Sequence, residues 1–234
     1  MEKETTQLSR AVISAFKKHY PKAWKGGAQG AILLQKGNTM LLQRYQQRRL
    51  VATWADLELP EDFPIKNVMV YIAPGEKSSA GGRYSRKDDF LGVQAFVKMD
   101  GDQPDINDMI PHLKGLIRHE LEHSSQDSPN PSGVMWNKLD SVLNYFTDPT
   151  ETPAWVAGIY KQAKTSGLPF SKVVDYYMDK WREMMADYHS DAAIQDVLEQ
   201  IRANWMAEAK RRFPKAQHIT KMPQFVQPDE REFG

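Results

Sequence analysis

The sequence contains no cysteine among its 234 residues. That absence excludes a disulfide framework, a thiolate zinc site and a cysteine nucleophile, so any metal ion must be held by His, Asp or Glu side chains. Long apolar runs are also missing, and none approaches the roughly 20 residues that a membrane span needs. The first residues are charged from Glu2 onwards and lack the pattern of a signal peptide. We therefore expect a cytoplasmic protein with no membrane partner.

An excess of charge of one sign is missing too. The chain carries 31 Lys and Arg against 30 Asp and Glu, a formal net charge of +1, which gives no overall field towards nucleic acid or anionic lipid. Two local basic clusters lie at 43–50 and 210–215. The second is at an expected helix end, where cations suit the helix dipole. A nucleic-acid partner is therefore not favoured.

The first hundred residues indicate a small sheet with one helix. Apolar residues recur at helical spacing over 4–19. Apolar runs predict four strands, at 30–36, 39–45, 67–73 and 90–99. The first two flank a Gly-Asn turn signal and are expected to form a β-hairpin. The glycine- and serine-rich stretch 74–89 is too polar for the core and is expected to be a connection, so we predict a largely antiparallel sheet.

From residue 105 the pattern becomes helical. Helices are predicted at 105–126, 134–146, 153–165, 170–188 and 190–212. The Met and Trp residues between 176 and 206 lie at helix-packing spacing and are interpreted as core. The tail 221–234 is expected to be irregular. The sequence thus predicts an α+β protein with a helical C-terminal half.

The stretch "LIRHELEHSSQ" places two histidines one helical turn apart. A helix advances about 100 degrees per residue, so His119 and His123 share a face and both imidazoles can reach one ion. Glu120 is turned away from that pair and can hold a metal-activated water. Zinc hydrolysis needs this division between neutral imidazole ligands and a carboxylate that takes a proton. The alternative is a pair of surface histidines with an acidic neighbour.

A zinc ion needs a third protein ligand. His112 lies seven residues before His119, about 10.5 Å along the helix axis, which is too far for one ion. Glu151, in "NYFTDPTETPAW", is the better candidate, and Pro153 requires it to lie in the first turn of its helix. The same position suits a structural role, because Asp148 and Glu151 have the spacing of a capping box. The ligand and the cap exclude each other for the same oxygens, and both interpretations stay open.

The segments "RHELEHSSQ" and "YFTDPTETPAW" together resemble the glutamate zincins (gluzincins), zinc metallopeptidases with an HExxH and a later glutamate, and in particular the small zincin-like proteins encoded by bacteriophages. The resemblance covers residues 112–157. It implies a Zn²⁺ site held by His119, His123 and Glu151, with Glu120 as general base. It also implies a zincin-like fold in which a small, mostly antiparallel sheet packs on the HExxH helix, and a location in the host cytoplasm or the virion.

The resemblance also organises the chain. We expect a metallopeptidase domain over 1–168, followed by a helical extension over 169–234 that packs on the same core. Within the domain the sheet, the metal helix and the third-ligand segment are placed at about 29–99, 105–125 and 145–165. The strand before the metal helix, at 89–99, is expected to form the edge along which an extended peptide lies.

The function implied is a zinc-dependent metallopeptidase that hydrolyses peptide bonds with a metal-activated water, and its partner is a protein or peptide substrate. Oxyanion stabilisation needs a further donor. Candidates are Tyr145 and Tyr160, which flank Glu151, and Arg83 and Tyr84 in the glycine-rich stretch. The sequence does not select among them, and Tyr145 is the working catalytic candidate. The alternative is a non-catalytic zincin scaffold, such as a phage structural or host-interaction factor, that uses the metal for stability.

Overall fold

The computed structural model describes residues 1–23, 31–37, 53–100, 103–127 and 133–214. Within these residues the protein is α+β, with six helices and a small mixed sheet. The helices are α1 (Glu2–Ala23), α3 (Ile106–Ser124), α4 (Leu139–Phe146), α5 (Glu151–Ser166), α6 (Phe170–Met185) and α7 (Asp191–Arg212). The strands are β1 (Ile32–Lys36), β2 (Thr53–Asp56), β3 (Asn67–Gly75), β4 (Ser79–Ser85), β5 (Phe90–Asp100) and β6 (Gln103–Pro104).

The sheet has the strand order β2-β1-β3-β5-β4, and β6 pairs with β5. The prediction of a largely antiparallel sheet is wrong, because β1 pairs parallel with β2 and β3 pairs parallel with β5. The long central strands β3 and β5 are continuously buried in their first four residues and less so towards their ends. Of the expected hairpin, β1 lies within 30–36, whereas 39–45 lies outside the described residues.

The stretch expected to be a connection contains β4, which pairs antiparallel with β5 from Ser79 to Ser85. The Gly81-Gly82 pair gives β4 a low intrinsic strand propensity, so the sequence pattern did not predict it. Pairing with the long strand β5 overrides that low propensity. The position of β4 also corrects the expected substrate edge. The strand β5 lies inside the sheet between β3 and β4, so β4 is the edge strand on that side.

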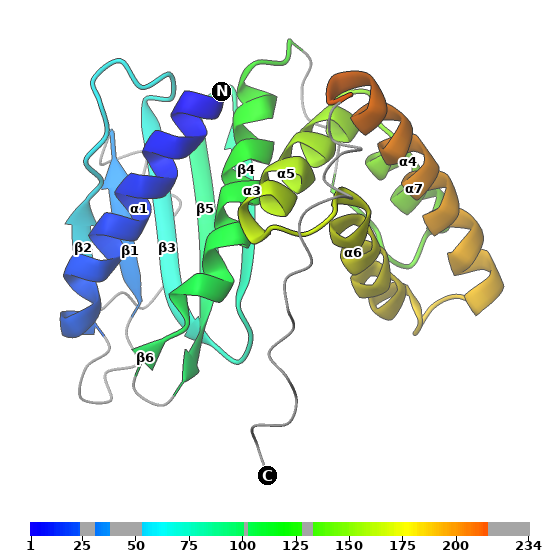
Figure 1. Cartoon of the computed structure of the whole chain (residues 1–234), viewed down its shortest axis with the longest axis horizontal. Helices are drawn as coiled ribbons and strands as arrows, with labels where there is room; N and C mark the ends of the chain where they lie inside the picture. The colour runs from blue at the N-terminus through cyan, green and yellow to red at the C-terminus, as the bar shows by residue number, and fades with distance from the viewer. Residues whose placement is uncertain (24–30, 38–52, 101–102, 128–132, 215–234) are drawn as a thin grey trace.

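Three apolar clusters form the core, two large ones and a small one of Leu33, Met69 and Phe90. In the first, α1 and α3 pack across one face of the sheet, with Leu8, Phe16, Leu113 and Ile117 fully buried. The second joins α4, α5, α6 and α7 around Trp205, and Figure 1 shows these helices as a second lobe beside the sheet. The apolar packing thus groups α4 and α5 with α6 and α7, whereas the sequence analysis placed α5 with the sheet in one unit ending at 168.

Candidate metal centre

The helix α3 carries the His-Glu-x-x-His motif. The Asp105 side chain begins this helix by accepting a hydrogen bond from the Asp108 backbone N–H at 3.3 Å. Met109, Leu113, Ile117 and Leu121, spaced four apart, are buried against the sheet. Because that apolar stripe fixes the rotation of the helix, the histidine face is turned towards α5 in the second lobe.

Three ligand atoms converge at this face. The Nε2 atoms of His119 and His123 lie 3.0 Å apart. In the Glu151 carboxylate, Oε2 lies 3.7 Å from the His119 nitrogen and Oε1 lies 3.4 Å from the His123 nitrogen. Tetrahedral zinc with bonds of about 2.0–2.1 Å separates its ligand atoms by about 3.3–3.4 Å. All three residues are buried, so the donor set fits a zinc ion with no large movement.

A glycine pair brings Glu151 to the histidines. Where α3 crosses α5, Gly115 faces Gly158, and a Cβ on Gly158 would lie 2.8 Å from the Gly115 carbonyl oxygen and 3.1 Å from the His119 Cβ. Any side chain at this crossing therefore requires the two helices to separate. The sequence signal for this approach is present as two isolated glycines inside predicted helices, a pattern that indicates packing or function.

The start of α5 leaves the Glu151 carboxylate available for the histidines. The N-cap residue is Thr150 and not Asp148. The Asp148 Oδ1 accepts hydrogen bonds from the backbone N–H of Thr150 at 2.7 Å and, more weakly, of Glu151 at 3.4 Å. The backbone N–H of Asp148 donates to the Tyr145 carbonyl at 3.3 Å. The carboxylate of Glu151 therefore takes no part in a capping box and faces the imidazoles, and Pro153 lies in the first turn as expected.

The Gln126 side chain determines which His123 nitrogen faces the centre. The Gln126 Nε2 donates to the Thr150 carbonyl at 2.6 Å, which orients the amide so that its Oε1 meets His123 Nδ1 at 2.8 Å. An amide oxygen accepts only, so Nδ1 carries the proton, and Nε2 of the neutral ring presents a lone pair. Partners of this kind orient metal-binding imidazoles in known sites.

The electrostatics of the centre call for a positive charge. Burial, with the neighbouring His123, lowers the pKa of His119 well below its usual value. Burial also acts to lower the pKa of His123, but the hydrogen bond and the negative charge of Glu151 outweigh it, so that pKa is raised. Glu151 Oε2 is buried with no hydrogen-bond partner in the described part of the chain. Among the described residues no lysine or arginine pairs with Glu151, and two imidazoles with a carboxylate are a donor set that zinc accepts.

Glu120 is buried beside this group. Its carboxylate and the two imidazoles offer ligand atoms within 4.8 Å of one another, and it packs against the edge strand, where a Cβ on Gly82 would lie 3.0 Å from Glu120 Oε1. Burial raises the pKa of Glu120 to about 8, with Glu151 adding to the rise and His123 opposing it. The carboxylate therefore lies next to the ligand set and against the backbone of β4.

Of the candidates for oxyanion stabilisation, the structure brings Tyr145 to the centre. Burial, together with the charge of the neighbouring Glu151, raises the pKa of its hydroxyl. Tyr160 instead stacks on the Phe213 ring at 4.2 Å. The Arg83 guanidinium lies over the Phe90 ring at 5.7 Å, and the Tyr84 hydroxyl faces Asp89 at 3.5 Å. None of these last three side chains reaches the histidines.

One residue of the second basic cluster, Arg212, makes contacts inside the molecule. The Arg212 guanidinium donates to the Pro153 carbonyl at 2.9 Å and pairs with Glu122, which also meets Arg118 at 2.8 Å. Arg212 thereby ties the end of α7 to α3 and to the first turn of α5. Of the other basic cluster, 43–50, nothing is described.

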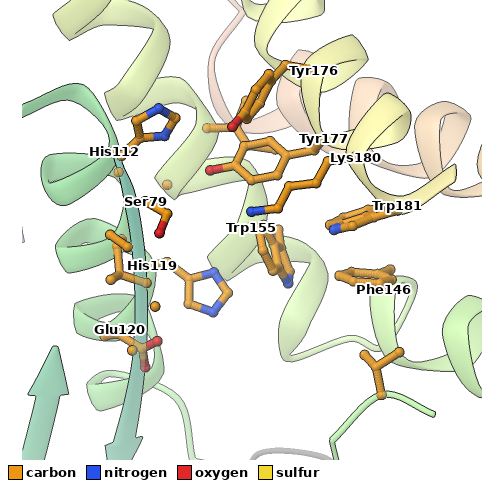
Figure 2. Close-up of a pocket in the computed structure, with 18 of the residues that line it drawn as sticks. Ser79, His112, His119, Glu120, Phe146, Trp155, Tyr176, Tyr177, Lys180 and Trp181 are labelled. Atoms are coloured by element: carbon orange, nitrogen blue, oxygen red, sulfur yellow. The ribbon is translucent and has the colours of Figure 1, made fainter. Parts of the chain in front are cut away.

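A cavity of about 350 Å³ opens beside the centre. One wall is formed by α3 and the Ser79–Gly82 segment of β4, and the other by aromatic rings of α4, α5 and α6. Figure 2 shows His119 and Glu120 on the first wall, facing Trp155, Trp181 and Phe146. The sequence analysis did not assign a functional role to Gly82, Gln126, Trp155 or Lys180. The only sequence signals for them were a glycine pair, a glutamine three residues after the motif, and residues at core spacing.

Comparisons with protein-family models, curated proteins and solved structures found no match for this chain. Among the described residues, no helix combines the length and apolar character needed to cross a bilayer.

Proposed function

We propose that this protein is a zinc-dependent metallopeptidase with a zincin-like fold. The observation that carries the proposal is the convergence of His119, His123 and Glu151, whose ligand atoms lie 3.0 to 3.7 Å apart. In this proposal the three side chains hold the metal. When bound, zinc supplies a Lewis acid that activates water at neutral pH and polarises a carbonyl group.

The chain's own residues supply the remaining chemistry. Glu120 takes the proton from the attacking water and delivers it to the leaving amine, and its place beside the imidazoles and against β4 suits that role. The Tyr145 hydroxyl, close to Glu151, donates a hydrogen bond to the developing oxyanion. Glu120 is buried, whereas Tyr145 is half-buried.

The peptide binds along β4 in this proposal. The strand lies at the edge of the sheet, and its Ser79–Gly82 segment lines the cavity beside the centre. An extended peptide adds to such an edge by backbone hydrogen bonds. Gly81 and Gly82 carry no side chain that would hold the peptide away from Glu120.

The test combines metal content with turnover. Protein purified without added metal is analysed for zinc and then incubated with a mixed peptide library whose products are identified by mass spectrometry. We expect one zinc per chain, lost in both His123→Ala and Glu151→Ala. In Glu120→Gln we expect zinc to stay and the hydrolysis rate to fall about 10²- to 10⁴-fold.

The matched control is Glu183→Gln, an exposed carboxylate on α6, which should keep both zinc and turnover. Hydrolysis by Glu120→Gln at the wild-type rate would contradict the proposed general base. Stoichiometric zinc with no hydrolysis of any library member by the wild type would support the non-catalytic scaffold instead.

A further inference from the structure

The cavity beside the metal centre carries one cation among its described lining residues, Lys180 of α6. In Figure 2 its side chain reaches into the cavity between the rings of Tyr177 and Trp155, from the wall opposite His119. Lys180 makes no ion pair with any described residue. An unpaired ammonium among aromatic rings is a binding group for an anion that comes from outside the chain.

The other polar groups at this end of the cavity already bind one another. Tyr177 donates its hydroxyl to Gln162 Oε1 at 2.9 Å, and Gln162 Nε2 in turn lies 3.1 Å from His112 Nδ1. The indole N–H of Trp155, by contrast, is buried without a hydrogen-bond partner in the described part of the chain. The cavity therefore offers Lys180 Nζ as a donor that no described acceptor satisfies, whereas Trp155 Nε1 lies next to the Tyr145 side chain.

The titratable groups Glu120 and Lys180 lie on opposite walls of the cavity. The carboxylate of Glu120 lies on the α3 wall, with Glu151 behind it, and Lys180 lies on the α6 wall. Lys180 and Ser79–Gly82 also border a second hollow on the other side of β4. A peptide that lies along β4 therefore passes Lys180, and an acidic group on it is attracted there.

We propose that Lys180 is a specificity-determining residue that binds a carboxylate of the peptide substrate, with the surrounding aromatic rings enclosing the apolar part of the same residue. The carboxylate is either an acidic side chain or the peptide's own C-terminus, since both present the same group. This inference deepens the proposed function and rests on it, because it names the substrate class of the same site.

The test measures binding separately from turnover. Zinc-loaded Glu120→Gln protein is titrated with synthetic peptides, and the tryptophan fluorescence of the cavity is followed. One set, amidated at the C-terminus, carries a single Glu scanned along an uncharged sequence. A second set carries Gln at the same positions, and a third is the Gln set with a free C-terminal carboxylate.

Either the Glu set or the free-carboxylate set should bind roughly tenfold more tightly than the amidated Gln set, as a charge-assisted hydrogen bond predicts, and the tighter set identifies the source of the carboxylate. Adding Lys180→Met should abolish the preference, and Lys180→Glu should reverse it towards peptides that carry Lys. The matched control, Lys172→Met, changes an exposed lysine of the same helix and should leave the preference intact.

Equal binding of all three sets, or a preference that survives Lys180→Met, overturns the inference. The outcome is independent of the proposed function. Hydrolysis by the wild type without a carboxylate preference leaves the peptidase proposal standing and removes this one. A Lys180-dependent preference in a protein that hydrolyses nothing leaves a carboxylate-binding site and removes the peptidase.

Discussion

The two walls of the cavity are built from opposite kinds of residue. On the α3 and β4 side, Gly82 and Gly115 remove bulk next to Glu120 and the histidines. On the other side, aromatic rings pack on one another, with Trp155 stacked on Trp205 at 5.4 Å and Phe146 on Trp181 at 3.7 Å. The first wall lets backbones and titratable groups approach closely, and the second holds the start of α5 in place.

The candidate centre depends on both walls, for different reasons. The histidines arrive with α3, whose rotation is set by the sheet. Glu151 arrives with α5, which packs among the aromatic helices and touches α3 at the glycine crossing. A change at the Gly115–Gly158 crossing should therefore disturb the centre itself, whereas a change among the rings should lower stability and leave the ligands together.

The largest effect is expected from Gly158→Val. The new Cβ would lie 2.8 Å from the Gly115 carbonyl oxygen, so α3 and α5 must separate, and overpacking of this kind costs about 2–3 kcal/mol. Urea unfolding of the metal-free protein should show that loss, and zinc affinity should fall with it because Glu151 moves away from the histidines.

The control for this crossing is Gly133→Val. A Cβ on Gly133 meets no described atom within 4 Å, so stability should change by less than about 0.5 kcal/mol. Unchanged zinc affinity in Gly158→Val would show that the Gly115–Gly158 crossing does not set the position of Glu151.

A smaller effect is expected from Trp205→Phe on the aromatic side. The buried indole N–H donates to the Phe146 carbonyl at 2.8 Å. The Thr152 hydroxyl lies 3.1 Å from that carbonyl and 3.0 Å from Asn204 Oδ1. Its single proton can turn to the carbonyl, so the loss should be about 1–2 kcal/mol. Zinc content should stay at the wild-type level.

Trp136→Phe, which alters a half-buried ring of the same cluster, should cost less. Loss of zinc from Trp205→Phe without unfolding would break the distinction between the two walls.

The smallest effect concerns pH and His112. Burial lowers its pKa from the usual 6.5, although Asp108 acts to raise it and Lys180 acts with burial. The folded protein thus binds this proton less tightly than the unfolded chain does, so the contribution to stability is complete above about pH 6.5 and is lost as the pH falls below that value.

His112→Asn keeps an acceptor for Gln162 and removes the titration. Unfolding midpoints measured at about pH 7.5 and about pH 5.5 should therefore differ more for the wild type than for His112→Asn. Equal pH dependence in the two proteins would mean that the titration of His112 does not contribute to the stability of the fold.

The helices were largely predictable from the sequence, because a helix satisfies its backbone hydrogen bonds locally and shows its buried face every third or fourth residue. The predicted α3 boundaries agree with the structure within a residue or two, and Pro153 correctly required Glu151 to lie in a first turn. The α+β class is confirmed. The sheet was harder, since β4 has almost no strand signal of its own and exists because β5 pairs with it.

The sequence by itself determined that His119, Glu120 and His123 share one helix, because their spacing and the apolar stripe beside them are local properties. Tertiary structure decided what meets them. Contact between α3 and α5 at Gly115 and Gly158 brings Glu151 within 3.7 Å of the imidazoles, and pairing of β4 with β5 places Gly82 against Glu120. Such contacts join segments that are far apart in the chain. The distance between these segments depends on the shape of their surfaces and on which strands pair, and no local sequence pattern encodes either.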